Sequence, residues 1–334
     1  MRLTPDDLHE MQSMPLALKV RMTKRRITEW VSHYGEDGVY IGFSGGKDST
    51  VLLHIARSLY PDILAVFVDT GLEFPEIRTF VRTFDNVEWL RPEMTFKQVI
   101  ETYGYPMISK NVSNKIHGAR NYLKRAEEAQ RQGKPLPPET SRYRQVMGTY
   151  TMNNGRPSEF NCPKYKFLLD APFEISSACC DVMKKRPLHK YNRETGRLAM
   201  TAQMAYESLT RRKNRLKNGC NGFNMAAPIS NPMAFWTEQD VLRYIKDCGL
   251  PLCPVYGKIT ESQDGTLTTT GLDRTGCMFC GFGCHLEKRS RFVNMKYTHP
   301  KQYDYIMRPK EKGGLNYKEV IDWINEHGSL HIEY

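Results

Sequence analysis

No stretch of 18 apolar residues occurs in the sequence, so it has no segment long enough to cross a bilayer as a helix. Its first 20 residues include Asp6, Asp7 and Glu10 and no apolar core, which argues against a secretory signal. It also has no internal repeat. Hydrophobic residues make up 40% and charged residues 25%, as in globular proteins. We therefore expect a folded, cytoplasmic protein without a membrane partner.

Acidic residues are too few to balance the basic ones, and the 334-residue chain carries a formal net charge of +11. Such a surplus suits an anionic partner, either a nucleotide or a nucleic acid. The alternative is a basic surface that is merely solvated, because lysines and arginines are spread along much of the chain. The sequence does not indicate an oligomeric state.

The nine cysteines are an odd number, which argues against a complete set of disulfides, and a cytosolic chain is not expected to form them. Five have the spacing of metal ligands: Cys179, Cys180, Cys277, Cys280 and Cys284. Four thiolates from two segments can hold a tetrahedral zinc or an iron–sulfur cluster. A cluster suits the adjacent pair better, because neighbouring side chains tend to diverge. We expect three others in the hydrophobic core: Cys220, Cys248 and Cys253.

Short apolar runs alternate with amphipathic segments over residues 39–90. The pattern predicts three buried strands, at 39–43, 63–68 and 87–90. It predicts two helices between them, at 50–59 and 75–84. This order indicates βαβ units and a parallel sheet, so the predicted fold class is α/β. Further along, we predict a strand at 198–201 and a helix that ends at Cys248, with Thr237 as N-cap and Asp240 at the capping-box position.

Residues 109–160 do not continue this alternation and are rich in lysine and arginine. We interpret them as a charged insertion, helical at 121–131, which either grips a partner or is only a solvated excursion. The rest of the chain then divides into a helical lead-in at 1–35, an α/β domain at 36–285 with a cysteine-rich C-terminal part, and a helical extension at 286–334.

Between the first predicted strand and helix, residues 44–49 read Ser-Gly-Gly-Lys-Asp-Ser. The glycines let backbone N–H groups approach phosphate oxygens, and the helix N-terminus adds positive potential. Five residues are candidate phosphate contacts: Ser44, Gly45, Gly46, Lys47 and Ser49. Asp48 adds an anion, so we expect it to cap the helix or to help hold Mg²⁺. The spacing is neither Walker A nor G-x-G-x-x-G, and the alternative is a glycine turn with a helix cap.

This loop resembles the PP-loop of the adenine-nucleotide alpha-hydrolase superfamily. Residues 69–76, Asp-Thr-Gly-Leu-Glu-Phe-Pro-Glu, resemble the Asp-Thr-Gly-x-x-Phe-Pro-Glu segment of its phosphoadenosine phosphosulfate (PAPS) reductase family. The resemblance covers 36–285, apart from the insertion. It implies a Rossmann-like open parallel sheet of the HUP type that binds an adenine nucleotide at the carboxyl ends of its strands. It adds three residues to the nucleotide site: Asp69, Thr70 and Gly71.

Residues 179–188 resemble the Cys-Cys-x-x-Arg-Lys-x-x-Pro-Leu pattern of adenylylsulfate (APS) reductases, except that Met183 replaces the arginine. Those proteins carry a 4Fe-4S cluster on Cys-Cys…Cys-x-x-Cys. The resemblance therefore implies a 4Fe-4S cofactor on four residues: Cys179, Cys180, Cys277 and Cys280. It leaves Cys284 as a rival ligand or a reactive thiol. It also implies a catalytic lysine near the cluster, Lys184.

Residues 201–211 resemble the family's Gly-x-Arg-x-x-Glu-Ser-x-x-Arg segment at three positions, which join the predicted nucleotide site: Glu207, Ser208 and Arg211. Ala202 replaces the glycine, and Met204 replaces the first arginine, which would bind phosphate or sulfate oxygens. Sulfonucleotide reductases also carry a C-terminal Glu-Cys-Gly-x-His whose cysteine attacks sulfur, whereas no cysteine follows Cys284 in this sequence.

The resemblance implies an enzyme, and two reactions compete. In the first, Mg²⁺-bound ATP is cleaved between its α and β phosphates, an adenylate forms, and the cluster assists sulfur transfer to a nucleic acid or a sulfur-carrier protein. Lys47 would stabilise the pyrophosphate, and Asp48 or Asp69 would hold Mg²⁺. The alternative is reduction of APS or PAPS in sulfate assimilation. A third hypothesis is a non-catalytic protein that binds nucleotide or nucleic acid and keeps a structural cluster.

Overall fold

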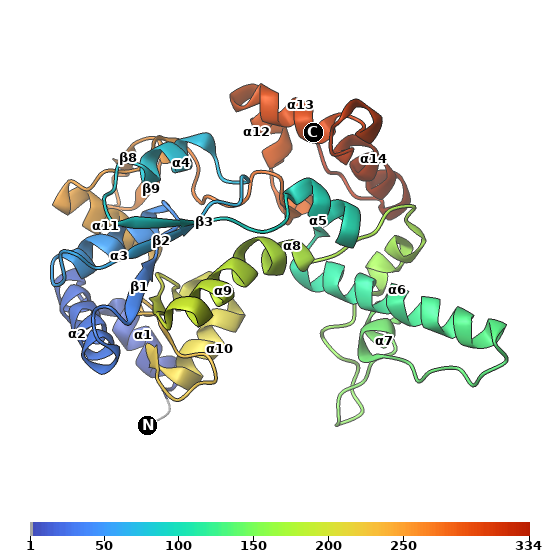
Figure 1. Cartoon of the computed structure of the whole chain (residues 1–334), viewed down its shortest axis with the longest axis horizontal. Helices are drawn as coiled ribbons and strands as arrows, with labels where there is room; N and C mark the ends of the chain where they lie inside the picture. The colour runs from blue at the N-terminus through green and yellow to red at the C-terminus, as the bar shows by residue number, and fades with distance from the viewer. Residues whose placement is uncertain (1–2) are drawn as a thin grey trace. The chain divides into compact units, whose positions relative to one another are not determined.

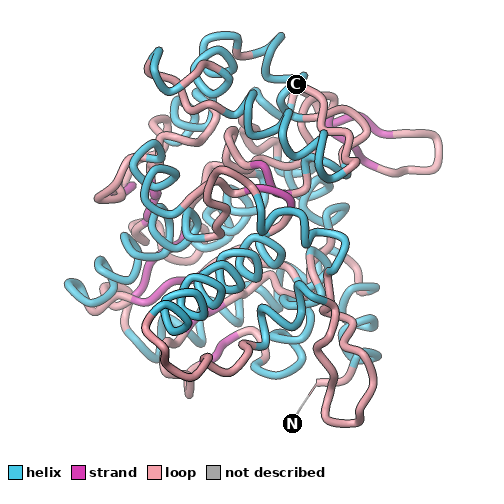
Figure 2. The backbone as a smooth tube through the Cα atoms, turned by 90° about the vertical axis from the view of Figure 1, so that its right-hand side faces the viewer, coloured by secondary structure: helices cyan, strands magenta, loops and turns pink. Residues whose placement is uncertain are grey.

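The computed structural model describes residues 3–334, which form two compact units (Figure 1). We call them the sheet unit, which comprises the chain up to Pro92 and Arg186–Gly276, and the cysteine unit, which comprises Glu93–Lys185 and Cys277–Tyr334. Each unit is therefore built from two separate segments of the chain. Helices and loops account for most of the backbone, and the strands are short (Figure 2).

The sheet unit is built on six strands in the order β3-β2-β1-β5-β7-β6. Neighbouring strands are parallel, except that β6 pairs antiparallel with β7 at one edge. The strands are β1 (Val39–Gly42), β2 (Ala65–Val68), β3 (Val87–Leu90), β5 (Leu198–Met200), β6 (Asn221–Gly222) and β7 (Ile229–Ser230). The predicted α/β class with an open, mostly parallel sheet is confirmed.

Helices of the same unit bury the apolar strands, as both faces of a parallel sheet require. The helices are α1 (Pro5–Ser13), α2 (Leu16–Tyr34), α3 (Lys47–Arg57), α4 (Pro75–Val81), α9 (Arg186–Thr195), α10 (Leu209–Asn218) and α11 (Glu238–Cys248). Helix α3 contacts β1, α2 and α11. Trp30 of α2 and Trp236, just before α11, are fully buried in the resulting core. A small hairpin, β8 (Ile259–Glu261) and β9 (Leu267–Thr269), packs against α11.

Local sequence signals place several of these elements correctly. The three predicted strands at 39–43, 63–68 and 87–90 are β1, β2 and β3. The predicted capping box of α11 is also present, since Thr237 accepts a hydrogen bond from the backbone of Asp240 and the Asp240 carboxylate accepts one from Thr237 N–H at 2.7 Å. Three helix ends differ from the prediction. Helix α3 begins three residues early, inside the glycine loop, and ends at Arg57, and α4 ends at Val81.

The cysteine unit is mainly helical. Its helices are α5 (Phe96–Tyr103), α6 (Lys110–Arg131), α7 (Ser141–Met147), α8 (Ala178–Cys180), α12 (Arg291–Thr298), α13 (Pro300–Met307) and α14 (Tyr317–Gly328). Two short strands, β4 (Met107–Ile108) and β10 (Gly281–Phe282), pair in parallel. Gly281 is required there, because a Cβ atom at this position would lie 2.7 Å from the backbone carbonyl oxygen of Pro106.

Helix α6 is twice as long as the predicted helix at 121–131, which forms only its second half. Ser109 caps its N-terminus by accepting a hydrogen bond from Val112 N–H. Val112, Ile116 and Ala119 are buried, so the first half of α6 has an apolar face that the surrounding lysines and arginines obscure in the sequence. The charged insertion is therefore partly a packed helix of the cysteine unit.

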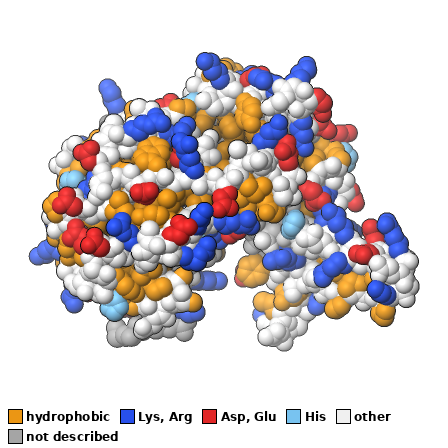
Figure 3. All heavy atoms as spheres, viewed as in Figure 1, with side chains coloured by type: hydrophobic (Ala, Val, Ile, Leu, Met, Phe, Trp, Pro, Cys, Tyr) orange, Lys and Arg blue, Asp and Glu red, His pale blue; other side chains and the backbone are white. Residues whose placement is uncertain are grey.

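Charged side chains of both signs alternate on the face drawn in Figure 3, where lysines and arginines lie among aspartates and glutamates. Between residues 3 and 334, no helix is both long enough and apolar enough to cross a bilayer.

Lys19 of α2 is almost fully buried, and its ammonium contacts both carboxylate oxygens of Asp240 at 2.7 and 2.8 Å. We expect Lys19→Met to lower the free energy of unfolding by about 3 kcal/mol, because it leaves a largely buried carboxylate without its partner. Urea denaturation would measure the loss. The matched control on the same helix is Arg25→Met, whose ion pair with Glu29 is exposed and should be worth less than about 1 kcal/mol. Equal losses from both substitutions would contradict this assignment.

Candidate functional site

The loop at 44–49 connects β1 to α3, as the sequence predicts for a phosphate site. Gly45 has φ +69°, and a Cβ atom there would lie 2.7 Å from Val81 Cγ2. Both the backbone conformation and the close packing against α4 therefore require glycine. Gly46 is the N-cap of α3, so the loop ends at the positive end of that helix.

Backbone N–H groups of the loop donate to side-chain hydroxyls. Ser44 N–H donates to Ser49 Oγ at 3.2 Å, Gly46 N–H to Ser44 Oγ at 3.3 Å, and Lys47 N–H to the Tyr256 hydroxyl at 3.3 Å. A hydroxyl can rotate to serve as a donor or as an acceptor. Phosphate oxygens could therefore replace these acceptors without breaking backbone–backbone hydrogen bonds of the protein.

The ammonium of Lys47 is buried, with 4% of its side chain exposed. It donates to the Glu238 carboxylate and to the backbone carbonyl of Asp273, and it lies 5.6 Å from the centre of the Tyr256 ring. Because a buried ammonium needs a partner, Glu238 balances the charge of Lys47 in this structure. An incoming phosphate would compete with Glu238 for the same cation.

Two arginines converge on one buried carboxylate beside this loop. Arg211 and Arg274 both donate to Glu207, whose side chain is 5% exposed. Arg211 and Arg274 also line the pocket above the loop, together with Ser44, Lys47, Asp48, Ser49, Gln203, Glu207, Tyr256 and Thr275. Three cations therefore border one cavity, an arrangement that suits an anionic ligand.

Asp48 lies in the same pocket, and burial raises the pKa of its carboxyl, although Lys47, Arg274 and Arg211 act in the opposite direction. Its Oδ1 is buried and has no hydrogen-bond partner among the described residues. Desolvation therefore exceeds the stabilisation from the surrounding cations. The unpartnered Oδ1 of Asp48 can therefore accept a hydrogen bond from a ligand or bind a cation.

The predicted contacts Asp69, Thr70 and Gly71 are engaged in local interactions. Asp69 accepts from Arg78 at 2.9 Å and from Gly71 N–H at 3.3 Å, and the Thr70 hydroxyl donates to Glu73 at 2.8 Å. None of the three lines the pocket above the loop. Ser208 is also absent from this lining, since its hydroxyl caps α10 by accepting from Arg211 N–H.

Four residues of this neighbourhood were missed by sequence reasoning: Tyr256, Arg274, Thr275 and Glu238. The first three lie in segments whose hydrophobic pattern predicts neither a helix nor a strand. They also lie about 200 residues after the glycine loop in the sequence, although they line the same pocket. The sequence indicated Glu238 only as the first residue of the predicted helix after its N-cap Thr237, with no sign of a contact to Lys47. The short Asp-Arg-Thr-Gly segment at 273–276 was the available signal for Arg274, but nothing in its sequence indicates phosphate binding.

The four predicted cluster ligands all belong to the cysteine unit. The pKa of Cys179 is raised by its hydrogen bond to Cys180, by burial, and by the charges of Cys280 and Cys277. Cys179 and Cys180 end α8, which continues into a π-helical turn at Asp181–Lys185. Across residues 3–334, no three His, Cys, Asp or Glu side chains are arranged closely enough to hold a metal ion.

Cys180 has a lowered pKa, unlike Cys179 and Cys280. Its pKa is lowered by the hydrogen bond from Cys179 and by the charges of Lys110, Lys184 and Lys185, although burial acts against them. Lys184, predicted to lie near the cysteines, is thus one of the cations that favour a thiolate at Cys180. A thiolate is the form that binds metals.

Cys284 differs from the four predicted ligands. Its thiol donates to the backbone carbonyl of Gly281 at 3.0 Å, and burial raises its pKa to about 12. His285 contacts the Tyr165 hydroxyl at 3.3 Å. These contacts favour a neutral thiol at Cys284. Of the cysteines predicted in the core, Cys220 and Cys253 are buried there, but Cys248 is exposed at the end of α11, and that prediction was wrong.

Comparisons with known proteins agree with these features. Residues 38–282, more than half of the chain, match the family described as "Phosphoadenosine phosphosulfate reductase domain". The phosphoadenosine 5'-phosphosulfate reductase of Xylella fastidiosa strain M23 is 32% identical over 76 residues, 23% of this chain and 32% of that protein. An uncharacterized protein of Methanocaldococcus jannaschii is 34% identical over 91 residues, 25% of this chain and 22% of that protein. The matched region spans about a third or less of these relatives.

A solved structure of PAPS reductase from Candida auris, in complex with phosphate, is also similar. It is 13% identical, with a TM-score of 0.38, and the similarity covers 80% of this chain and 99% of that one.

We expect Glu238→Gln to tighten binding of pyrophosphate in the absence of divalent metal roughly tenfold. The substitution removes the carboxylate that competes for Lys47, and one charge-assisted hydrogen bond is worth about 1.5–3 kcal/mol. Isothermal titration calorimetry would measure the change. Glu261→Gln, which alters an exposed glutamate paired with Arg243 and Lys246, is the control and should have no effect. Weaker binding by Glu238→Gln would show that Glu238 helps to hold the ligand and would contradict the prediction.

Proposed function

Because the chain belongs to the phosphoadenosine phosphosulfate reductase domain family, we propose that it is an enzyme that acts on an adenine nucleotide. One observation carries the proposal: Lys47, Arg211 and Arg274 border a single pocket at the glycine loop that ends β1. The phosphates would lie at residues 44–49, where backbone N–H groups and the N-terminus of α3 meet. The serine hydroxyls of the loop would donate to the same oxygens.

The first candidate reaction is reduction of a sulfonucleotide, APS or PAPS. The Xylella fastidiosa relatives named phosphoadenosine 5'-phosphosulfate reductase support it. Arg211 and Arg274 would bind sulfate or phosphate oxygens, and Lys47 would neutralise the 5′-phosphate that carries the sulfate. Arginines that are already oriented by Glu207 would lose little freedom on binding.

The second candidate is ATP pyrophosphatase chemistry, with adenylation that leads to sulfur transfer. Two observations favour it. Met204 occupies the position of the arginine in the resembling family segment and is fully buried, so it offers no charge to a sulfate. Asp48 and Glu238 flank Lys47 and supply carboxylate oxygens, which Mg²⁺ bound to ATP prefers. Lys47 would then stabilise the departing pyrophosphate.

We also propose that Cys179, Cys180, Cys277 and Cys280 hold a 4Fe-4S cluster. The mutual influence of these thiols on their pKa values supports their proximity, and three lysines near Cys180 would offset the negative charge of a thiolate-bound cluster. A bound cluster would supply electron-transfer or sulfur-transfer chemistry. Lys184 would be one of the cations that stabilise a thiolate at Cys180.

The two reactions differ in their products. With APS or PAPS and a thiol or thioredoxin donor, the first candidate predicts release of sulfite; with Mg²⁺-ATP, the second predicts release of pyrophosphate. We expect sulfite, because the relatives' names favour the first candidate, and Lys47→Ala should reduce its release at least a hundredfold. Pyrophosphate without sulfite would establish the second candidate instead. Absence of both products, with nucleotide still bound, would contradict an enzymatic role.

The cluster has its own test. Protein purified without oxygen should contain about four irons and four sulfides and should absorb broadly in the visible range. We expect Cys277→Ser to lose the iron, whereas the control Cys284→Ser should retain it, because the Cys284 thiol is already bonded to the backbone carbonyl of Gly281. Zinc in place of iron, or iron lost only in Cys284→Ser, would contradict the proposed cluster.

A further inference from the structure

The guanidinium of Arg215, in the last turn of α10, is buried without an anionic partner in the described part of the chain. Arg215 is 5% exposed, and its Nε atom has no hydrogen-bond partner among residues 3–334. Within the same residues, its one hydrogen bond runs to the sulfur of Met11 at 3.3 Å, and sulfur is a weak acceptor. The centre of the Phe235 ring lies 6.0 Å from the guanidinium carbon and offsets the charge only in part. Because buried charges are usually paired, this cation needs an anion.

The ionisable groups beside Arg215 do not neutralise it. Arg26 of α2 is itself a cation and pairs with Glu29 at 2.8 Å. Cys220 lies next to both arginines, but burial raises the pKa of its thiol despite their charges, which favours the neutral form. Burial also lowers the pKa of Arg215, as expected when the desolvation of a cation exceeds the attraction from its neighbours. An anion bound from solution would supply the missing counter-charge.

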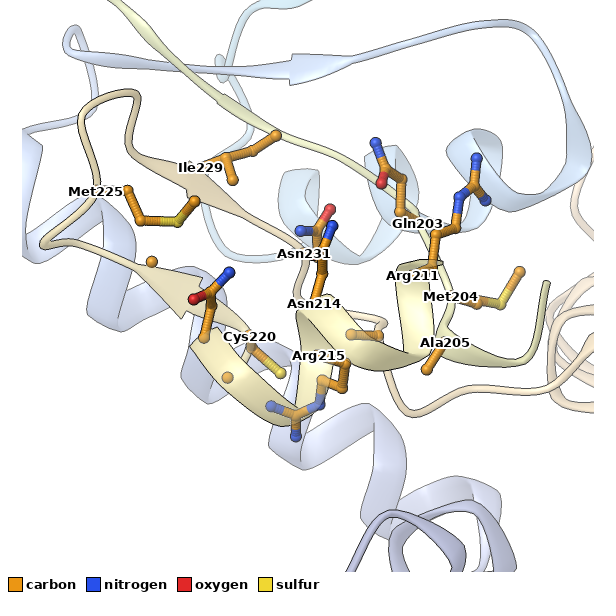
Figure 4. Close-up of a pocket in the computed structure, with 14 residues that line it drawn as sticks. Gln203, Met204, Ala205, Arg211, Asn214, Arg215, Cys220, Met225, Ile229 and Asn231 are labelled. Carbon is orange, nitrogen blue, oxygen red and sulfur yellow. The ribbon is translucent and has the colours of Figure 1, made fainter. Parts of the chain in front are cut away.

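A cavity of about 340 Å³, which we call the Arg215 cavity, lies at the charged end of this side chain. The groups that contact or influence the guanidinium, Met11, Arg26 and Cys220, all line it. A smaller cavity of about 150 Å³ also borders Arg215, but Met11 and Arg26 do not line that one. Figure 4 shows the smaller cavity, and in it the Arg215 side chain extends toward Cys220 and away from Asn214. The guanidinium therefore faces the larger, Arg215 cavity.

The Arg215 cavity has the size and the walls of a site for a small organic molecule. Its volume exceeds the roughly 300 Å³ at which ligand pockets begin. Met11 of α1, Leu216 of α10 and Phe223, just after β6, line it with apolar surface. Phe223 packs on the buried Trp30, with the two ring centres 5.1 Å apart. A ligand with an apolar body would cover these side chains while its charged group contacts Arg215.

The charges around the cavity favour a ligand with a single negative charge. Arg26 and Glu29 neutralise each other, and Lys217, which also lines the cavity, is exposed to solvent. One buried guanidinium is left to be balanced, and a carboxylate supplies one charge and two oxygens that match its planar fork. A phosphate dianion would bring a second negative charge close to Glu29, which would repel it.

We propose that the Arg215 cavity binds a small organic carboxylate, with the carboxylate group on Arg215 and an apolar body against Met11 and Phe223. The cavity is separate from the phosphate pocket, because no residue lines both. The proposal therefore goes beyond the nucleotide chemistry of that pocket and does not depend on which candidate reaction is correct. A carboxylate bound there would also stabilise the folded protein, because the unfolded chain has no such cavity.

A ligand-observed NMR titration of the full-length protein with benzoate, in the absence of nucleotide, tests the proposal. We expect saturable binding. Benzamide has a similar shape without the charge and should bind at least tenfold more weakly, because it cannot form an ion pair with the guanidinium. Absence of saturable benzoate binding, or equal binding of benzamide, would overturn the proposal.

Arg215→Met locates the site, because it removes the charge and keeps a long side chain. It should weaken benzoate binding at least tenfold. The matched control is Arg274→Met, which alters an arginine at the phosphate pocket with 59% of its side chain exposed and should leave the benzoate affinity unchanged. Weaker binding by Arg274→Met but not by Arg215→Met would place benzoate in the phosphate pocket and contradict the assignment.

Met11→Trp tests the cavity without removing the charge, and it decides the question if Arg215→Met does not fold. The larger side chain should fill the cavity and abolish benzoate binding, so undiminished affinity would refute the site. Phenyl phosphate distinguishes the two anion chemistries. The part of its binding that Arg215→Met removes should be weaker than that of benzoate, and the opposite order would overturn the choice of a carboxylate. Because the cavity and the phosphate pocket share no residue, failure here leaves the product assays for the nucleotide site unaffected.

Discussion

The buried ammonium of Lys47 links the glycine loop to Glu238 of α11 and to the backbone carbonyl of Asp273. A cation with 4% of its side chain exposed requires a fixed counter-charge, and Glu238 provides it from the first turn of α11. The same turn carries Asp240, which pairs with the buried Lys19 of α2 and closes the capping box with Thr237. Two buried lysines are therefore neutralised by carboxylates two residues apart. The N-terminus of α11 is thereby fixed beside the glycine loop.

This arrangement explains how the loop can accept an anionic ligand. The loop amides donate to rotatable hydroxyls, and the ammonium is paired with a carboxylate that is partly exposed. Each of these partners can be displaced by a phosphate oxygen without unfolding a helix or a strand. Arg211 and Arg274 are held beside the loop by the buried carboxylate of Glu207. The pocket is thus preorganised for an anion, which lowers the entropic cost of binding.

Much of the sheet unit could be predicted from the sequence because its signals are local. Apolar runs identified β1 to β3, glycines with a following helix identified the loop, and the capping box identified the start of α11. The partners of Lys47 could not be predicted in the same way, since Glu238 and Asp273 lie about 200 residues away and follow no period. The reverse applies to Asp69, whose position at a strand end suggested a ligand contact, although Arg78 occupies its carboxylate.

The central claim is that the glycine loop and Lys47 bind the phosphates of an adenine nucleotide. Equilibrium dialysis with radiolabelled ATP or APS would test it most directly in the parent protein and in Lys47→Ala, with circular dichroism to verify that the variant is folded. We predict saturable binding by the parent and at least tenfold weaker binding by the folded variant, because one charge-assisted contact is lost. Equal affinity in the two proteins would contradict the account.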